Sequence, residues 1–100
     1  MPELTPTKLF LKDIKALAVN HVVYKKMLKA LSLLRENPFH PGLRLERIVN
    51  DPSAWAVRVD QQYRISIDPE AYQPSGTPDW RSGIILLRVL DHDDLYKKPR

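Results

Sequence analysis

The chain has 100 residues, 43% of them hydrophobic, with no cysteine and a formal net charge of +4. This length indicates one domain, residues 1–100. The lack of cysteine excludes a disulfide framework and thiol chemistry. No apolar run reaches the roughly 18 residues that a membrane span needs. The basic balance favours a nucleic acid or an acidic protein as partner, and because MPELTPTKLF lacks the signal-peptide pattern, we expect a cytoplasmic protein with no membrane contact.

A first helix is predicted in TPTKLFLKDIKAL. Thr5 is the expected N-cap, and Pro6 suits the first helical position because its fixed φ matches the helix and its missing N–H is not needed there. Phe10, Ile14 and Leu17 then recur at helical spacing and define one apolar face.

A second helix is predicted from Asn20, its expected cap, to about Glu36. Pro38 ends it, since proline disfavours helix at the residue before it and cannot continue the hydrogen-bond ladder. The apolar stripe consists of Val23, Met27, Leu31 and Leu34. The lysines between these positions are expected to face water, and the two helices are expected to form an antiparallel hairpin.

The second half of the chain predicts strands. GLRLERI (42–48) and WAVRVDQQYRISID (55–68) alternate apolar and polar residues, and SGIILLRVL (82–90) is continuously apolar, which is typical of a strand covered on both faces. The proline-rich segment 68–81 is expected to be a long hairpin loop. The predicted fold class is therefore α+β, with a helical hairpin on one face of a small antiparallel sheet of three or four strands.

The segment 55–68 predicts its own strand register. A three-residue loop keeps the apolar residues of both strands on the helix side, with Val57 opposite Ile65, and it places Arg58 opposite Arg64 on the other side. Like charges in such a cross-strand pair repel each other. We therefore expect an anion beside the pair: a carboxylate such as Glu46, an acidic side chain of a partner, or a phosphate.

The closing segment RVLDHDDLYKKPR carries further polar chemistry. Arg88 and His92 are predicted on one face of the last strand, with Tyr96 following on a turn or short helix. Histidine is the side chain whose ordinary pKa lies nearest neutrality. A histidine among aspartates is by itself typical of a surface turn, so the hypothesis of a site depends on Arg58, Arg64, His92 and Tyr96 occurring together in one small domain.

Nearly the whole chain resembles the RelE/ParE superfamily of type II toxin–antitoxin toxins. The resemblance lies in KLFLKDIKAL, KALSLLRENPFHPGLRLERI, WAVRVDQQYRISID and ILLRVLDHDDLYK, and above all in the arginine–turn–YRI hairpin and the closing histidine and tyrosine. It implies the RelE-like fold, a twisted antiparallel sheet with a helical hairpin on one face. Members of the superfamily begin with a β-strand, which we expect to be short or missing here because only MPEL precedes the TPT segment.

The resemblance leaves three functions open. RelE-, YoeB- and HigB-like members are mRNA interferases that inhibit translation, most of them cutting mRNA in the ribosomal decoding site, whereas ParE-like members poison DNA gyrase without nuclease activity. A degenerate antitoxin-binding module is the third possibility. The first is favoured: a ribosome-dependent endoribonuclease without cofactor, held by a cognate acidic antitoxin and, like other toxins of this kind, associated with plasmid stabilisation.

The resemblance also implies roles for individual residues. The superfamily's arginine pair corresponds to Arg58 and Arg64, its acid/base position to His92 and its tyrosine to Tyr96, while Glu46 lies near a position where some members carry a carboxylate base.

Metal-independent attack by the RNA 2′-hydroxyl needs these residue types: a base, an acid and cations at the phosphate. Four further cations are expected to bind RNA, namely Arg44, Arg88, Lys97 and Lys98. A metal site is not expected, because His21, His40 and His92 lie on different predicted elements without ligand spacing.

Overall fold

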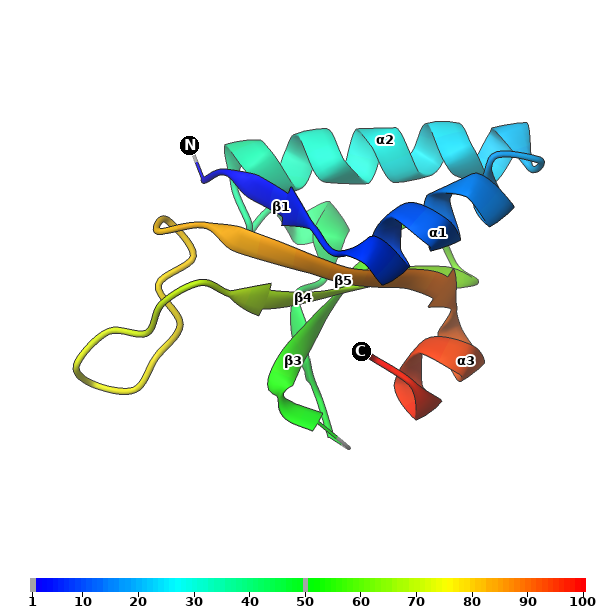
Figure 1. The fold of residues 1–100 in the computed structure, drawn as a ribbon. Coiled ribbons are helices and arrows are strands. Elements are labelled where there is room, and N and C mark those ends of the chain that lie inside the picture. Colours follow the sequence, from blue (N-terminus) through cyan, green and yellow to red (C-terminus); the bar gives the residue numbers. More distant parts are fainter. Residues whose placement is uncertain (1, 50) are drawn as a thin grey trace.

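The computed structural model describes residues 2–49 and 51–100 and shows an α+β protein (Figure 1). The elements in chain order are β1 (Leu4–Pro6), α1 (Lys8–Leu17), α2 (His21–Glu36), the 3₁₀ helix η1 (Pro41–Leu43), β2 (Glu46–Ile48), β3 (Asp51–Arg58), β4 (Tyr63–Pro69), β5 (Ile84–Asp91) and α3 (His92–Lys97). No helix in this described part of the chain is both long and apolar enough to span a membrane.

The five strands form one sheet in the order β1-β5-β4-β3-β2. All neighbouring pairs are antiparallel except β1 and β5, which run parallel, so the sheet is mixed and the prediction of a purely antiparallel sheet is wrong at this edge. The N-terminal strand is present but has only three residues, with Thr5 paired to Ile85. An edge strand tolerates Pro6, whose missing N–H costs no ladder bond there.

This pairing also corrects the predicted start of the first helix. Thr5 belongs to β1, and Thr7 is the N-cap: its hydroxyl oxygen accepts a hydrogen bond from the Phe10 backbone N–H at 3.2 Å. The same hydroxyl donates to the Leu87 carbonyl at 3.0 Å, so Thr7 caps α1 and ties it to β5 at once. The second cap is confirmed, since the Asn20 side chain accepts from the Val23 N–H at 3.2 Å.

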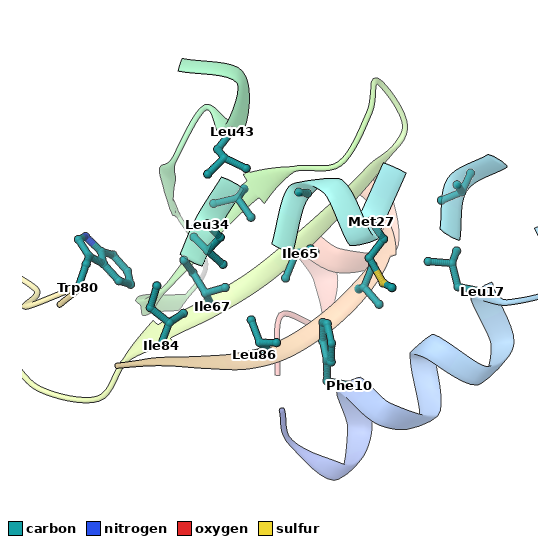
Figure 2. Close-up of a cluster of buried hydrophobic side chains, with 14 residues drawn as sticks. Phe10, Leu17, Met27, Leu34, Leu43, Ile65, Ile67, Trp80, Ile84 and Leu86 are labelled. Carbon is teal, nitrogen blue, oxygen red and sulfur yellow. The ribbon is translucent and has the colours of Figure 1, made fainter. Parts of the chain in front are cut away.

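Helices α1 and α2 follow each other directly and lie on the same side of the sheet (Figure 1). Their apolar faces and the facing strand residues form the main core, in which Figure 2 labels Phe10, Leu17, Met27, Leu34, Leu43, Ile65, Ile67, Trp80, Ile84 and Leu86. Trp80 comes from the long β4–β5 connection and meets Trp55 edge-on, with ring centroids 5.6 Å apart. The segment predicted as a hairpin loop therefore also closes one end of the core.

The register of the β3–β4 hairpin is confirmed. Val57 pairs with Ile65, Arg58 pairs with Arg64, and the Val59 N–H donates to the Tyr63 carbonyl at 3.0 Å across the loop. The buried residues Val57 and Ile65 face the helices. The apolar alternation therefore determines which side chains reach the opposite face.

The face of the sheet away from α1 and α2 carries a second, smaller core. Helix α3 lies on this side (Figure 1), and its buried Leu95 packs against Ala54, Ala56 and Leu87. The C-terminal tail continues across the same face, where the Ser66 hydroxyl donates to the Pro99 carbonyl at 2.6 Å. The face on which the sequence predicted no helix is thus partly covered by the C-terminal segment of the chain.

A partly buried ion pair joins α1 to β5. The Asp13 carboxylate, 8% exposed, accepts bonds from Arg88 Nε at 2.7 Å, from Arg88 Nη2 at 3.0 Å and from the Val89 N–H at 3.1 Å. The hydrogen bonds and the charge of Asp13 raise the pKa of Arg88 above its ordinary value, although burial opposes this. Arg88, expected from sequence to bind RNA, is held by this bidentate pair.

We expect Asp13→Ala to lower the free energy of unfolding by about 3 kcal/mol, because it leaves the partly buried Arg88 guanidinium and the Val89 N–H without their acceptor. The matched control is Glu36→Ala, which removes an exposed carboxylate at the end of α2 and should change stability by less than about 0.5 kcal/mol. Urea unfolding followed by circular dichroism measures both. Equal midpoints for the two variants would contradict the structural role of Asp13.

Candidate active site

Three elements that are distant in sequence bring four of the predicted site residues together. Glu46 lies on β2, Arg64 on β4, and His92 and Tyr96 on α3. Asp91 is the N-cap of α3, its side chain accepting from the Asp93 N–H at 3.0 Å, so the strand becomes a helix at His92. Because the helix begins at His92, His92 and Tyr96 both belong to it, and residues four apart in a helix are neighbours on the same face.

Tyr96 is the centre of the cluster. Its hydroxyl donates to Oε1 of Glu46, and its ring meets the His92 ring edge-on, with centroids 4.7 Å apart and planes at 61°. Burial, together with the hydrogen bond and charge of Glu46, raises the pKa of Tyr96 to about 12, against the opposing effect of Arg64. At neutral pH, Tyr96 is therefore a neutral phenol that donates its proton to a carboxylate.

Arg64 is more buried than the alternation of apolar and polar residues in its strand predicted. It is 8% exposed, and its Nη1 donates to the backbone carbonyls of Asp60 and of Tyr63, the latter at 2.9 Å. Its charge and a side-chain hydrogen bond also act on the Tyr96 phenol. The predicted repulsion between the arginine pair is thus relieved by carbonyl oxygens at the loop.

His92 is fixed by the β3–β4 loop. Its backbone N–H donates to the Gln62 carbonyl at 2.6 Å, and its Nδ1 lies 3.1 Å from Oδ1 of Asp93. The Gln62 side chain donates to Oδ2 of Asp91 at 2.8 Å, a bond that lowers the pKa of Asp91. Gln62 therefore positions the start of α3, a role that no signal in the sequence indicated.

The other predicted cations lie outside this cluster. Arg58 lines a separate cavity beside α2, and Arg88 is paired with Asp13. Arg44 is exposed after η1 in a left-handed conformation with φ 48°, and Lys97 and Lys98 are exposed at the end of α3. Only the two lysines adjoin Tyr96 in the chain.

A small pocket of about 220 Å³ opens beside the cluster, lined by Glu46, Arg47, Ile48, Val49 and Tyr96. It presents a carboxylate as proton acceptor and a phenol as donor, with an imidazole against the phenol and a guanidinium acting on it. This set of groups can move a proton to and from a bound substrate and offset negative charge that develops on it.

No protein-family model and no curated protein sequence matches the chain, but solved structures do. YafQ from E. coli strain BL21(DE3) matches with a TM-score of 0.70 at 14% identity, over 95% of this chain and 98% of that one. The E. coli DinJ–YafQ complex gives a TM-score of 0.71 at 14% identity over the same shares, and a YoeB/ParE toxin from Agrobacterium tumefaciens gives 0.68 at 13% over 90% and 98%. The chain therefore has the fold of YafQ and of this YoeB/ParE toxin, in agreement with the fold that the resemblance implied.

The tyrosine pKa gives a direct test of the cluster. Because the pKa of Tyr96 is raised from 10 to about 12, its proton stabilises the folded state fully below pH 10, and this contribution is lost as the pH rises through about 12. We expect Glu46→Gln to bring the pKa of Tyr96 back toward 10, because the carboxylate charge is gone. The ¹³C shifts of tyrosine ring carbons report the titration, with Tyr96→Phe assigning the resonance.

An unchanged Tyr96 titration in Glu46→Gln would contradict the hydrogen bond between these two side chains. Tyr72→Phe removes an exposed tyrosine and is the control, since it should leave the titration of Tyr96 as it is.

Proposed function

We propose that the chain is the toxin of a type II toxin–antitoxin system, and that it inhibits translation as an mRNA endoribonuclease acting on the ribosome. The fold supports this proposal because it is shared with YafQ and with a YoeB/ParE toxin. The observation that carries it is the hydrogen bond between Tyr96 and Glu46, with His92 against the tyrosine ring and the Arg64 charge acting on the phenol.

These groups fit cleavage by the RNA 2′-hydroxyl. Glu46, exposed at the edge of the pocket, takes the proton of the 2′-hydroxyl as its oxygen attacks the adjacent phosphorus. His92 gives a proton to the departing 5′ oxygen. The P–O5′ bond breaks as the new P–O2′ bond forms, which leaves a 2′,3′-cyclic phosphate on one fragment and a 5′-hydroxyl on the other.

Tyr96 and Arg64 serve this step without transferring a proton. With a pKa of about 12, Tyr96 stays a hydrogen-bond donor throughout and holds the Glu46 carboxylate in place. The buried Arg64 places a fixed positive charge under this site, where negative charge on the phosphate increases in the transition state. The exposed Lys97 and Lys98 are assigned to the flanking phosphates, and Arg44 to a more distant one.

A cognate acidic antitoxin is the proposed protein partner. One of the matching structures is a DinJ–YafQ toxin–antitoxin complex. The formal net charge of +4 on this chain favours an acidic partner of that kind.

A gyrase poison is the second candidate, because one matching structure is named a YoeB/ParE toxin. The two functions differ in what they require of the site, since a non-enzymatic toxin needs neither a base at Glu46 nor an acid at His92.

The nuclease proposal predicts specific losses of rate. On a defined mRNA in purified ribosomes, under single-turnover conditions, we expect Glu46→Gln and His92→Gln each to slow cleavage by on the order of 10² or more. Glu36→Gln, an exposed control with the same chemical change, should cleave at the wild-type rate. A 2′-O-methyl group on the nucleotide 5′ of the cut should abolish cleavage, because the nucleophile is blocked.

Wild-type rates in both Glu46→Gln and His92→Gln would end the nuclease proposal. An mRNA left intact by a chain that arrests gyrase supercoiling would favour the second candidate. A chain that does neither and still binds an antitoxin would be a degenerate binding module.

A further inference from the structure

A second cavity lies beside α2, η1 and the end of the β3–β4 hairpin. Its volume is about 480 Å³, more than twice that of the pocket at Tyr96, and the two share no lining residue. The polar residues that line it are Lys26, Lys29, His40, Arg58 and Asp60. The residues assigned to the cleavage step, Glu46, Arg64, His92 and Tyr96, lie outside it.

The cavity carries unbalanced positive charge. Its one carboxylate, Asp60, uses Oδ1 to accept the N–H groups of Gln62 at 2.9 Å and Tyr63 at 2.7 Å, and its Oδ2 lies 3.8 Å from Nζ of Lys26. Within residues 2–49 and 51–100, no acidic side chain pairs with Lys29 or with Arg58. Lys29 is therefore left to bind an anion in the cavity.

His40 adds a hydrogen-bond donor to these cations. Its Nδ1 accepts the Gly42 backbone N–H at 3.0 Å, the bond that closes η1. Because Nδ1 is the acceptor, the ring carries its proton on Nε2, which is left as a hydrogen-bond donor. The cap therefore fixes the tautomer that suits an anionic or carbonyl ligand.

The rest of the lining is apolar. Ala30 and Leu33 come from α2, and Val59 comes from the end of the hairpin. Cationic and apolar side chains that line one cavity match a ligand with a phosphate and a flat, largely apolar ring. The volume lies within the roughly 300–1,000 Å³ of small-ligand sites.

We propose that this cavity binds one nucleotide of an RNA strand, with the phosphate on Lys29 and the base against Leu33 and Val59. The inference rests on the proposed function for its choice of RNA. The β3–β4 hairpin links the two sites in the chain, because Arg58 lines the cavity and is the cross-strand partner of Arg64. The cavity lies beside α2 and the cleavage cluster beside α3, so the cavity is a substrate subsite apart from the point of cleavage.

RNA binding tests this subsite separately from cleavage. In a Glu46→Gln background, in which cleavage is expected to be slow, the affinity for a fluorescent single-stranded RNA is measured by anisotropy over a series of salt concentrations. We expect Lys26→Ala/Lys29→Ala to weaken binding about tenfold and to lower the salt slope by about 0.7 for each lost phosphate contact. Lys12→Ala/Lys15→Ala removes the same charge from exposed positions on α1 and should change the affinity less than twofold.

Adenosine 5′-monophosphate is the probe for the position of the site. By NMR, it should shift the backbone amides of residues 26–33 and 58–60 in the same background, and the Lys26→Ala/Lys29→Ala pair should abolish these shifts.

Equal losses in both lysine pairs would show that only overall charge matters, and would overturn the subsite. An acidic peptide of the same length that displaces the RNA from wild-type chain but not from the Lys26→Ala/Lys29→Ala pair would overturn it in favour of a protein-binding site. The experiment measures binding and not cleavage. If the chain does not cleave mRNA, a loss of RNA affinity in the Lys26→Ala/Lys29→Ala pair alone therefore still supports the subsite. If the chain cleaves mRNA but the Lys26→Ala/Lys29→Ala pair does not lose RNA affinity, the proposed function stands and the subsite is rejected.

Discussion

The register of the β3–β4 hairpin is the constraint on which the rest of the structure depends. Val57, Ile65 and Ile67 are fully buried on the helix side, and burying three such side chains contributes about 5–9 kcal/mol. The like charges of Arg58 and Arg64, which the same register brings together, cost a few kcal/mol at a protein surface. Apolar burial therefore outweighs the repulsion, and a slip of either strand by one residue would turn the arginine of that strand toward the core.

Once this register is set, the other face of the sheet carries the proposed site. Arg64 binds the carbonyls of its own loop, and α3 covers this face through Leu95. The helix brings Tyr96 to Glu46 on the strand β2. The tail is held as well: burial opposes ionisation of Asp51, but the hydrogen bond and charge of Arg100 outweigh it and keep the pKa of that carboxyl below its ordinary value.

The parts of this arrangement that follow from local pattern were predictable. Helical spacing located α1 and α2, and period-two alternation gave the hairpin register. Thr5 and Thr7 are equally good caps by residue type, and the parallel pairing of β1 with β5, which decides between them, is a long-range contact. Strand alternation predicted that Arg88 and His92 share one face. The pairing of β4 with β5 is irregular between Ser66 and Ile67, and the partner of Arg88, Asp13, lies 75 residues away in the chain, so local pattern could not predict the ion pair. The burial of Arg64 likewise depends on a helix that begins 28 residues later.

The central claim is that Glu46 and Tyr96 act as one unit in RNA cleavage, and a double-mutant cycle tests it most directly. Single-turnover rates are measured for Glu46→Gln, Tyr96→Phe and the double variant on one defined mRNA. If the phenol acts by holding the carboxylate, the double variant is no slower than the slower single variant. Losses of rate that multiply in the double variant would show that the two side chains act independently, and would contradict this account.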